Sequence, residues 1–427
     1  MATYPDSESQ SFDLSDDTSD DGMYLSSSHH KPAAPSYKLS RFTGPLIDYV
    51  RNEWQTNAKY AHLPSTGDRR RSESPRWIQM IMSIVTAPRF RRYVLVYMSL
   101  FLAAVLGWTF LLSPQLQEHA SLLRALDPQV KQEVGGWFGT NALPSFDDIV
   151  QLRTLDPALL PSHAVDQTGE AIPRRLIVIG DVHGCKVELE KLLEEVTFNH
   201  DHDHLIFTGD MINKGPDSLG VVDIAQQYGA SCVRGNHEDR VLLLRHDMMA
   251  TNVTRADTGD EHFLEQDTRE RQLAKDLNDD QAKWLDTCPV ILDVGQIKNM
   301  GQVVVAHAGL VPGVELEKQD PYSVMNMHTI DLDTHVPSSS RKGTKWTKLF
   351  NKHQSLVYST VKSGPEGITA LQTVIYGHDA KSSLTLKPYT KGLDSGCVKG
   401  GKLTAMVIEA DGEQKIVQVK CNDYSGK

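Results

Sequence analysis

Cysteine is scarce in this 427-residue chain, which contains five. The five are widely scattered, their number is odd, and no two of them form a CxxC pair. A zinc knuckle needs closely spaced cysteines, and a disulfide-stapled domain needs a dense cysteine framework. The sequence therefore predicts neither a structural zinc knuckle nor a disulfide scaffold.

An excess of positive charge is also missing. The chain carries 44 Lys and Arg against 55 Asp and Glu, which gives a formal net charge of -11. Proteins that rest on nucleic acid usually present a net basic surface, so no nucleic acid is expected as a partner. Hydrophobic residues make up 40% of the chain, which is ordinary for a globular domain. No pattern indicates an obligate protein partner.

Apolar residues are rare in residues 1–75, which include the stretch "SESQSFDLSDDTSDDG". Such a segment cannot bury enough apolar surface to offset the entropy lost on ordering. We expect residues 1–75 to form a disordered tail.

Charge is absent from "YVLVYMSLFLAAVLGWTFLLS", which runs from Tyr93 to Ser113. A helix of this length can cross the hydrocarbon core of a bilayer. A buried core helix is the alternative interpretation, although core helices usually keep a polar stripe. A cleaved signal peptide fits less well, because about ninety residues precede the run and a signal peptide has only a short n-region. The segment 93–113 is therefore predicted to be a transmembrane signal anchor.

Arginines precede this span, whereas residues 115–118 after it carry no positive charge. The positive-inside rule then places the tail in the cytosol and makes residues 76–92 a basic juxtamembrane segment. Residues 114–170 would form a linker or stalk, and residues 171–427 a domain on the lumenal side. There, Asn252 in "TNVT" would be a glycosylation acceptor.

Strand and helix patterns alternate after residue 171. "RRLIVIG", "HLIFTGD" and "ASCVRGNHED" are each followed by a helical pattern, which predicts three strand-loop-helix units and a mainly parallel sheet. Later runs appear without long intervening helices and predict a second sheet packed on the first: "CPVILDVG", "QVVVAHAG", "TVIYGHD" and "KLTAMVIEA". The expected fold class is α/β, a sandwich of two mixed sheets flanked by helices.

Potential metal ligands stand at five of the predicted strand ends, in "GDVHG", "GDMINKG", "RGNHE", "AHAG" and "YGHD". Each motif alone is a common turn or helix cap, but five in order predict a metal site. Carboxylate, imidazole and amide ligands without thiolate suit Zn, Mn, Fe or Co. Asp210 can bridge a pair of ions, Asn236 can supply a neutral ligand, and His237 is left to donate a proton. Two such ions can activate water for displacement at phosphorus.

This ordered set resembles the calcineurin-like metallophosphoesterases of the phosphoprotein phosphatase superfamily over most of Leu176 to Ala410. The resemblance implies two divalent ions, zinc before Mn, Fe or Co, and hydrolysis by a metal-bridging hydroxide. It implies that Asp181 and His183 bind the first ion and that Asp210 bridges. It further implies that the second ion is bound by Asn236, His307 and His378, and that His237 is the general acid.

The second motif departs from the eukaryotic protein phosphatases of that superfamily, which have Asp and Arg where this chain has Asn213 and Lys214. We expect Asn213 to accept a hydrogen bond from His237. Lys214 would offer phosphate a point charge in place of a guanidinium fork, and Arg234 is a further candidate for substrate binding.

Two stretches, "NKGPDS" and "GLDSGCVKGGKLTAMVIE", are similar to the bacterial-type branch that includes diadenosine tetraphosphate hydrolases. That branch combined with a cytosolic tail and one span resembles the fungal vacuolar zinc-dependent endopolyphosphatases. This resemblance implies hydrolysis of phosphoanhydride bonds in inorganic polyphosphate. It also implies a single-pass type II protein of the vacuolar membrane with its catalytic domain in the lumen.

Three alternatives stay open: a membrane-anchored serine/threonine phosphoprotein phosphatase, a diadenosine tetraphosphatase-like hydrolase, and a non-catalytic scaffold. A scaffold would have no reason to keep all six ligands. Basic residues that could recruit a polyanion collectively, or simply be solvated surface charges, are Arg341, Lys342, Lys345, Lys348, Lys352, Lys381, Lys399 and Lys402.

Overall fold

The computed structural model of the chain describes residues 75–127, 149–165, 171–251, 261–361 and 368–426. The expected disordered tail therefore lies outside the described residues except for Pro75, and Asn252 lies outside them as well. The chain divides into two compact units, residues 1–94 and 95–427, which are described separately.

The first unit contributes helix α2 (Arg76–Thr86) and the start of helix α3 (Pro88–Gly107). Ala87 between them has an extended backbone (φ -62°, ψ 127°). Proline disfavours the helical region for the residue before it, so Pro88 explains why α2 ends there.

The uncharged run lies in a continuous helical stretch from Pro88 to Ala125, made of α3, a π-helical turn (Trp108–Leu112) and α4 (Ser113–Ala125). By length and composition this stretch can cross a membrane. No residue of α3 is buried, whereas a core helix is mostly buried.

The second unit contains two mixed sheets. The first sheet holds three parallel strands, to which two antiparallel strands are added at one edge, and a further strand pairs with the first half of β3. Its strands in order are β15 (Gln414–Lys420), β14 (Lys402–Ile408), β3 (Ala171–Ile179), β4 (Asp203–Phe207) and β5 (Ser231–Cys232), with β2 (Ser162–Val165) beside β3.

The second sheet is also mixed, with the pairs β1/β6, β7/β11 and β11/β13 parallel and the pairs β6/β7 and β12/β13 antiparallel. Its strands in order are β1 (Leu152–Thr154), β6 (Ile291–Ile297), β7 (Gly301–Ala306), β11 (Gln372–Tyr376), β13 (Thr390–Gly392) and β12 (Thr385–Leu386). A small third sheet has the order β10 (Thr344–Lys345), β8 (Thr329–Ile330) and β9 (Pro337–Ser338).

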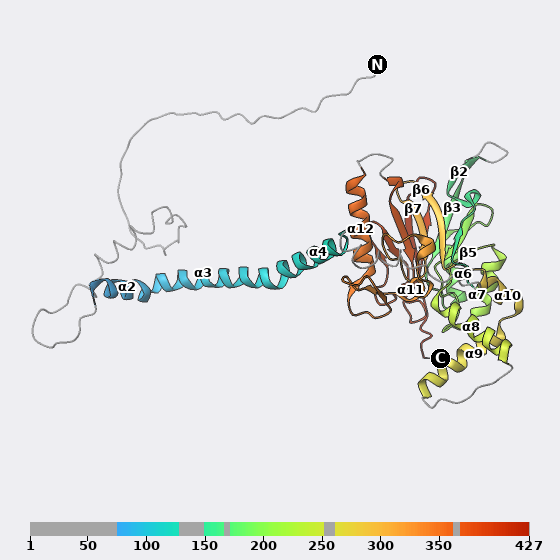
Figure 1. Cartoon of the computed structure of the whole chain (residues 1–427), viewed down its shortest axis with the longest axis horizontal. Helices are drawn as coiled ribbons and strands as arrows, with labels where there is room; N and C mark the ends of the chain where they lie inside the picture. The colour runs from blue at the N-terminus through green and yellow to red at the C-terminus, as the bar shows by residue number, and fades with distance from the viewer. Residues whose placement is uncertain (1–74, 128–148, 166–170, 252–260, 362–367, 427) are drawn as a thin grey trace, which may run out of the picture. The chain divides into compact units, whose positions relative to one another are not determined.

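The core lies in three layers because successive side chains of a strand point to opposite faces. In β3, Leu176 and Val178 pack between the two sheets, whereas Ile177 and Ile179 pack against the outer helices. In β7, Val303 and Val305 join the layer between the sheets, and Val304 joins the outer layer. The two sheets thus form a sandwich with helices on both outer faces (Figure 1), as the sequence predicted.

Different helices cover the two outer faces (Figure 1). The helices that pack on the first sheet are α6 (Lys186–Val196), α7 (Ser218–Gln227), α8 (Asn236–Thr251), α9 (Glu261–Asp276) and α10 (Asp279–Asp286). Those that pack on the second are α4, α11 (Pro321–Asn326) and α12 (Trp346–Thr360). The short helical turns are η3 (Pro157–Leu159) and η4 (Leu316–Lys318).

The three expected strand-loop-helix units are confirmed as β3-α6, β4-α7 and β5-α8. Two expectations about the later strands were wrong. "KLTAMVIEA" forms β14, which belongs to the first sheet because it pairs antiparallel with β3, Met406 opposite Val178. In addition, the long helix α12 precedes β11, and its apolar residues Trp346, Leu349 and Phe350 recur at helical spacing.

Part of the expected linker, residues 114–170, belongs to the folded unit. Leu122 and Ala125 of α4 are buried in the core cluster that contains α12, and the ring of His335 pairs through Nε2 with the carbonyl of Ala125, at 2.9 Å. Strand β1 pairs with β6, and Leu155 is buried between the sheets. The folded unit therefore begins before residue 171.

The scattered cysteines predicted no disulfide scaffold, yet four of the five form two disulfides. Cys232 at the end of β5 is bonded to Cys288 after α10, and Cys397 is bonded to Cys421, which leaves a single buried free thiol at Cys185. The partners are 56 and 24 residues apart in sequence, and only the fold brings their Cα atoms to 5.3 and 5.2 Å. Closing such loops stabilises a domain, typically by about 2–4 kcal/mol per bridge.

Candidate metal centre

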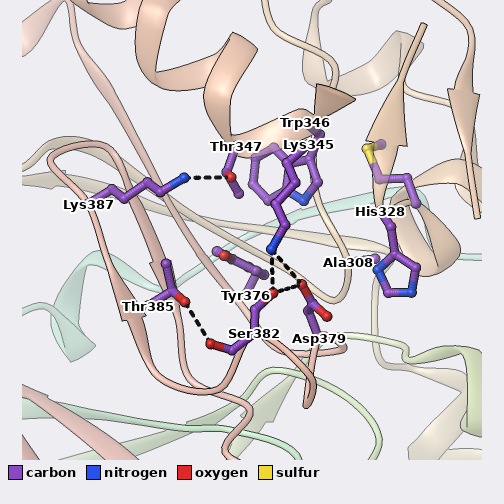
Figure 2. Close-up of a pocket in the computed structure, with 11 residues that line it drawn as sticks. Ala308, His328, Lys345, Trp346, Thr347, Tyr376, Asp379, Ser382, Thr385 and Lys387 are labelled. Atoms are coloured by element: carbon purple, nitrogen blue, oxygen red, sulfur yellow. Dashed lines mark hydrogen bonds and ion pairs between the residues drawn. The ribbon is translucent and has the colours of Figure 1, made fainter. Parts of the chain in front are cut away.

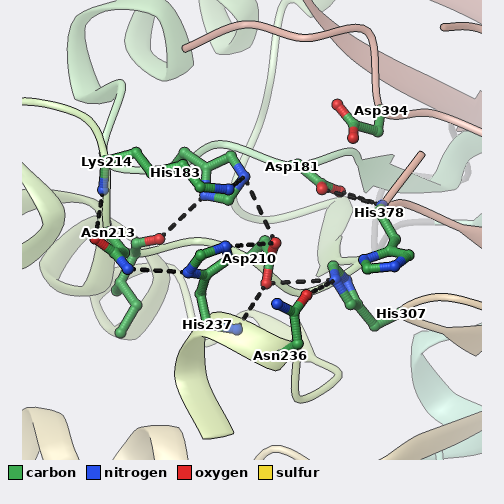
Figure 3. Close-up of polar contacts among 12 residues, drawn as sticks. Asp181, His183, Asp210, Asn213, Lys214, Asn236, His237, His307, His378 and Asp394 are labelled. Carbon is green, nitrogen blue, oxygen red and sulfur yellow. Dashed lines mark hydrogen bonds and ion pairs between the residues drawn. The ribbon is translucent and has the colours of Figure 1, made fainter. Parts of the chain in front are cut away.

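The candidate site lies where the strands of both sheets end (Figure 3). All six metal ligands expected from the sequence contribute to it: Asp181 and His183 after β3, Asp210 after β4, Asn236 at the start of α8, His307 after β7 and His378 after β11. The carboxyl ends of parallel strands meet at one edge of a sheet, which explains how residues as far apart as Asp181 and His378, 197 positions in sequence, converge.

The carboxylate of Asp210 lies at the centre of this group. Its Oδ1 is 3.3 Å from His307 Nε2, and its Oδ2 is 3.5 Å from His183 Nε2. Two sets of side chains, each with its ligand atoms within 4.8 Å of one another, have metal-binding composition: His183, Asp210 and His237, and Asp181, Asp210 and His307. Asp210 is common to both sets, the position that a bridging carboxylate would take.

The histidines are held in the orientation of metal ligands. His183 and His307 each direct Nδ1 at a backbone carbonyl, that of Ile212 at 3.2 Å and that of Thr208 at 2.8 Å. His378 instead uses Nε2, 3.2 Å from the carbonyl of Asn326. In a neutral ring, a nitrogen that donates to a carbonyl leaves the other nitrogen unprotonated and available to a metal. For His307, burial lowers the pKa, but the neighbouring Asp210 carboxylate outweighs burial and the pKa is raised.

Burial lowers the pKa of His183 well below its ordinary value and lowers that of His378 to about 3. Both rings are therefore neutral at pH 7, as ligands must be. The amide oxygen of Asn236 lies 3.0 Å from His307 Nε2, so its Oδ1 faces the same centre.

The carboxylates of Asp181 and Asp394 are buried beside each other. Burial raises the pKa of Asp181 well above its ordinary value, and the neighbouring charges of Asp394 and Asp210 raise it further. Close buried carboxylates repel unless a cation neutralises them. The donor set and this accumulation of negative charge both fit divalent cations. Asp394 was not predicted from the sequence, although it lies in the quoted stretch "GLDSGC".

Backbone strain is concentrated at this site. Nine described residues other than glycine have positive φ, and five of them belong to the site: His183, Asp210, Asn213, Lys214 and His378. Such conformations cost about 1–3 kcal/mol each and persist where the surroundings hold them in place. Close packing at the site also requires glycine at position 377, because a Cβ there would lie 1.9 Å from Asp181 Oδ1.

Glu238 ties two of the loops together. Its buried carboxylate accepts hydrogen bonds from the backbone N–H groups of Asp210 (2.7 Å), Ile212 (3.1 Å) and Gly235 (2.9 Å). Burial raises its pKa to about 7. We assigned no role to Glu238 from the sequence, although it ends the motif "RGNHE". It positions the loop that carries Asp210.

His237 has a different environment from the three other histidines. Its Nδ1 lies 2.9 Å from Asn213 Nδ2 and accepts a hydrogen bond from that amide. This reverses the expectation that Asn213 would accept from His237, because Asn213 Oδ1 already accepts from the N–H of Lys214 (2.7 Å). Burial lowers the pKa of His237 to about 4. The neutral ring then carries its proton on Nε2, 3.8 Å from Asp210 Oδ2.

Glu270 completes this arrangement from helix α9. Asn213 Nδ2 also donates to Glu270 Oε1 at 3.1 Å, and the fully buried Glu270 pairs with Arg240 at 2.7 Å. Glu270 therefore holds the Asn213 amide in the orientation that donates to His237. No motif surrounds Glu270, so the sequence offered no signal for it.

The two predicted substrate-binding residues have different surroundings. Lys214 Nζ lies 3.0 Å from His183 Nε2, within the centre. Arg234 is buried and forms ion pairs with Asp239 (3.0 Å) and Asp286 (3.2 Å). This environment makes Arg234 a support for the loop before α8, and it does not favour a direct contact with substrate.

Residues 174–382 match the family described as calcineurin-like phosphoesterase. This chain carries a calcineurin-like phosphoesterase domain. The domain is similar to the zinc-dependent endopolyphosphatase of Saccharomyces cerevisiae, 28% identical over 58% of this chain and 82% of that protein. It is also similar to symmetrical bis(5'-nucleosyl)-tetraphosphatases. The enzyme from Erwinia tasmaniensis is 38% identical over 32% of this chain and 44% of that protein. The enzyme from Nitrosospira multiformis is 25% identical over 58% of this chain and 96% of that protein.

The shared position of Asp210 generates a prediction about metal content. The full-length chain is purified in detergent and loaded with Zn²⁺ or Mn²⁺. Asp210→Asn should lower its affinity for every bound ion by at least about tenfold, because even the loss of a group that only hydrogen-bonds to a metal ligand lowers metal affinity that much. Metal per chain is measured by mass spectrometry at matched free metal. Asp201→Asn, in an exposed turn, is the control. Unchanged metal content in Asp210→Asn would exclude Asp210 from the ligand set.

Proposed function

We propose that the chain hydrolyses phosphoanhydride bonds of inorganic polyphosphate at a two-metal centre. The observation that carries the two-metal proposal is the carboxylate of Asp210, which is common to two groups of side chains of metal-binding composition. Hydrolysis is supported by the phosphoesterase family. Polyphosphate as the substrate is supported by the likeness to the zinc-dependent endopolyphosphatase.

The proposed first ion is bound by Asp181, His183 and Asp210, and the proposed second ion by Asp210, Asn236, His307 and His378. Zinc is our first choice, and Mn, Fe or Co suit the same donors. Two such ions supply Lewis acidity, which activates water and neutralises charge on the phosphoryl oxygens.

Three side chains near the proposed ions have separate roles in the proposed reaction. His237 donates the proton on Nε2 to the departing oxygen, since its Nδ1 is occupied by Asn213. Asn213 donates one amide hydrogen to His237 and the other to Glu270, which fixes the tautomer of the imidazole. Lys214 offers a positive charge to a phosphate oxygen.

The chain from Glu270 to His237 can be tested by a double-mutant cycle. With phenyl phosphate, whose leaving group is weakly acidic, His237→Ala should lower kcat about a hundredfold to ten-thousandfold with little change in KM. Glu270→Gln should lower kcat less, about tenfold, because it loosens Asn213 without removing the acid. Adding Glu270→Gln to His237→Ala should cost nothing further, since both act through one group.

The control for this cycle is Glu315→Gln, an exposed carboxylate that pairs with Lys318. A general acid matters less for an acidic leaving group, so both losses should be smaller with polyphosphate. If Glu270→Gln keeps its full effect in the absence of His237, Glu270 does not act through that histidine. If His237→Ala spares kcat, the general-acid assignment is wrong.

Substrate choice decides between the two leading functions. The second candidate is hydrolysis of diadenosine tetraphosphate, favoured by the likeness to symmetrical bis(5'-nucleosyl)-tetraphosphatases. We expect the full-length, metal-loaded chain to show a higher kcat/KM for long polyphosphate than for diadenosine tetraphosphate or a phosphoserine peptide. Product lengths on a gel then separate internal from terminal cleavage. A preference for the dinucleotide or the phosphopeptide would refute the proposal.

We propose that the helix Pro88–Ala125 anchors the chain as a single-pass type II protein of the vacuolar membrane, with the phosphoesterase domain in the lumen. Arginines before the span support this orientation. The two disulfides support it independently, because disulfides persist in oxidising compartments. The assignment to the vacuole rests on the family resemblance. Residues 1–75 as the cytosolic tail and a glycan on Asn252 belong to the same proposal.

Protease protection tests this topology. In sealed vesicles, protease should remove a tag at residue 1 and leave the phosphoesterase domain intact until detergent is added. Maleimide added under denaturing but non-reducing conditions should label one cysteine, Cys185, because the other four are bonded. Digestion of the domain in intact vesicles would refute the lumenal placement.

A further inference from the structure

A pocket lies at the second sheet, and Figure 2 shows the residues that line it. Its lining comes from β10, the start of α12, the loop after β11, and β12 with the turn that follows it. The lysine, aspartate, serine and threonine side chains among its lining residues are Lys345, Thr347, Asp379, Ser382, Thr385 and Lys387.

Three of the lining residues are neighbours of the candidate ligands. Ala308 and Asp379 line the pocket, and they directly follow His307 and His378 in the chain. His328 also lines it and stacks on the ring of His378, with ring centroids 4.5 Å apart. The pocket therefore borders the candidate metal centre on the side of His378.

Two lysines place positive charge in the pocket. Lys345 Nζ donates to Ser382 Oγ at 2.6 Å and lies 3.8 Å from Asp379 Oδ2. Lys387 Nζ donates to Thr347 Oγ1 at 2.9 Å, and among the described residues no carboxylate lies within ion-pair distance of it. Arg341 pairs with Asp379 at the same place, so the cations outnumber the single carboxylate.

The surroundings of Lys387 disfavour the charged form of its side chain. Burial lowers its pKa, and the neighbouring charges of Lys345 and Lys348 lower it further. A half-buried ammonium without a counter-charge, close to another, is unfavourable until an anion enters. Lys348 is partly neutralised by its ion pair with Glu118, which leaves Lys345 and Lys387 as the cations that face the pocket.

We propose that this pocket is a subsite for the phosphate groups next to the scissile bond, bound by Lys345 and Lys387. The proposal rests on the proposed function. Asp379 takes the place of substrate when the pocket is empty, because it pairs with Arg341 and Lys345. An entering phosphate replaces that carboxylate as the partner of Lys345 and gives Lys387 an anionic partner. The ligand class is a linear polyphosphate, which carries negative charge on successive phosphates.

A substrate with a single phosphate cannot occupy the metal centre and the subsite together. Chain length should therefore decide whether the two lysines matter. The test compares long polyphosphate with phenyl phosphate in the full-length, metal-loaded chain. The variants are Lys387→Gln, Lys345→Gln and the charge-retaining Lys387→Arg. Lys420→Gln, an exposed lysine on β15 of the other sheet, is the matched control.

We expect each Gln variant to raise KM for long polyphosphate about tenfold, which corresponds to about 1.4 kcal/mol. KM and kcat for phenyl phosphate should stay at the wild-type values. Lys387→Arg should restore most of the affinity, and the loss in the Gln variants should shrink at high salt, since exposed charges are screened. Thermal unfolding of each variant checks that the fold is kept.

Two results would overturn the subsite: an unchanged KM for polyphosphate in both Gln variants, or an equal rise of KM for phenyl phosphate. A third result separates the subsite from the proposed function. If the wild-type chain hydrolyses phenyl phosphate but not polyphosphate, the proposed function fails. The subsite then stands if the same variants raise KM for diadenosine tetraphosphate, and it falls if they do not.

Discussion

The buried carboxylate of Asp210 is the constraint on which the rest of the site depends. A carboxylate that is only 2% exposed needs compensation, and it obtains this from His307, His183 and the N–H of His237. Burial alone would raise its pKa, but the neighbouring histidines lower it well below the ordinary value. The loops that carry these groups must therefore converge on one point.

The sandwich provides that convergence. The first sheet carries Asp181, His183 and Asp210 on loops after its parallel strands, and the second sheet carries His307 and His378. Apolar side chains from both sheets pack into one buried layer, which holds the two sets of loops next to each other. Five site residues have left-handed backbone conformations, which persist because this packed layer restricts the loops. Glu238 restricts the loops further by accepting hydrogen bonds from three backbone N–H groups.

The site is asymmetric about Asp210. On the side of the first sheet, Glu270 and Asn213 orient His237, which makes this the side suited to proton donation. On the side of the second sheet, His328 stacks on His378 and leads to the pocket of Lys345 and Lys387. The side chain proposed to donate the proton and the lysines proposed to bind phosphate therefore lie on opposite sides of Asp210.

The sequence by itself determined the six candidate ligands, the apolar span and the alternation of strands and helices, because each depends on residues that are neighbours in the chain. When a turn motif follows an apolar strand, the residues of the motif itself determine the backbone conformation of the turn and supply the ligand atoms. Only the tertiary structure decided what depends on distant partners: the two disulfides, the place of β14 beside β3, the contact of Glu270 with Asn213 across 57 residues, and the meeting of Lys345 with Lys387. Periodicity reports which face of an element is buried, but not which residue of another element lies against it.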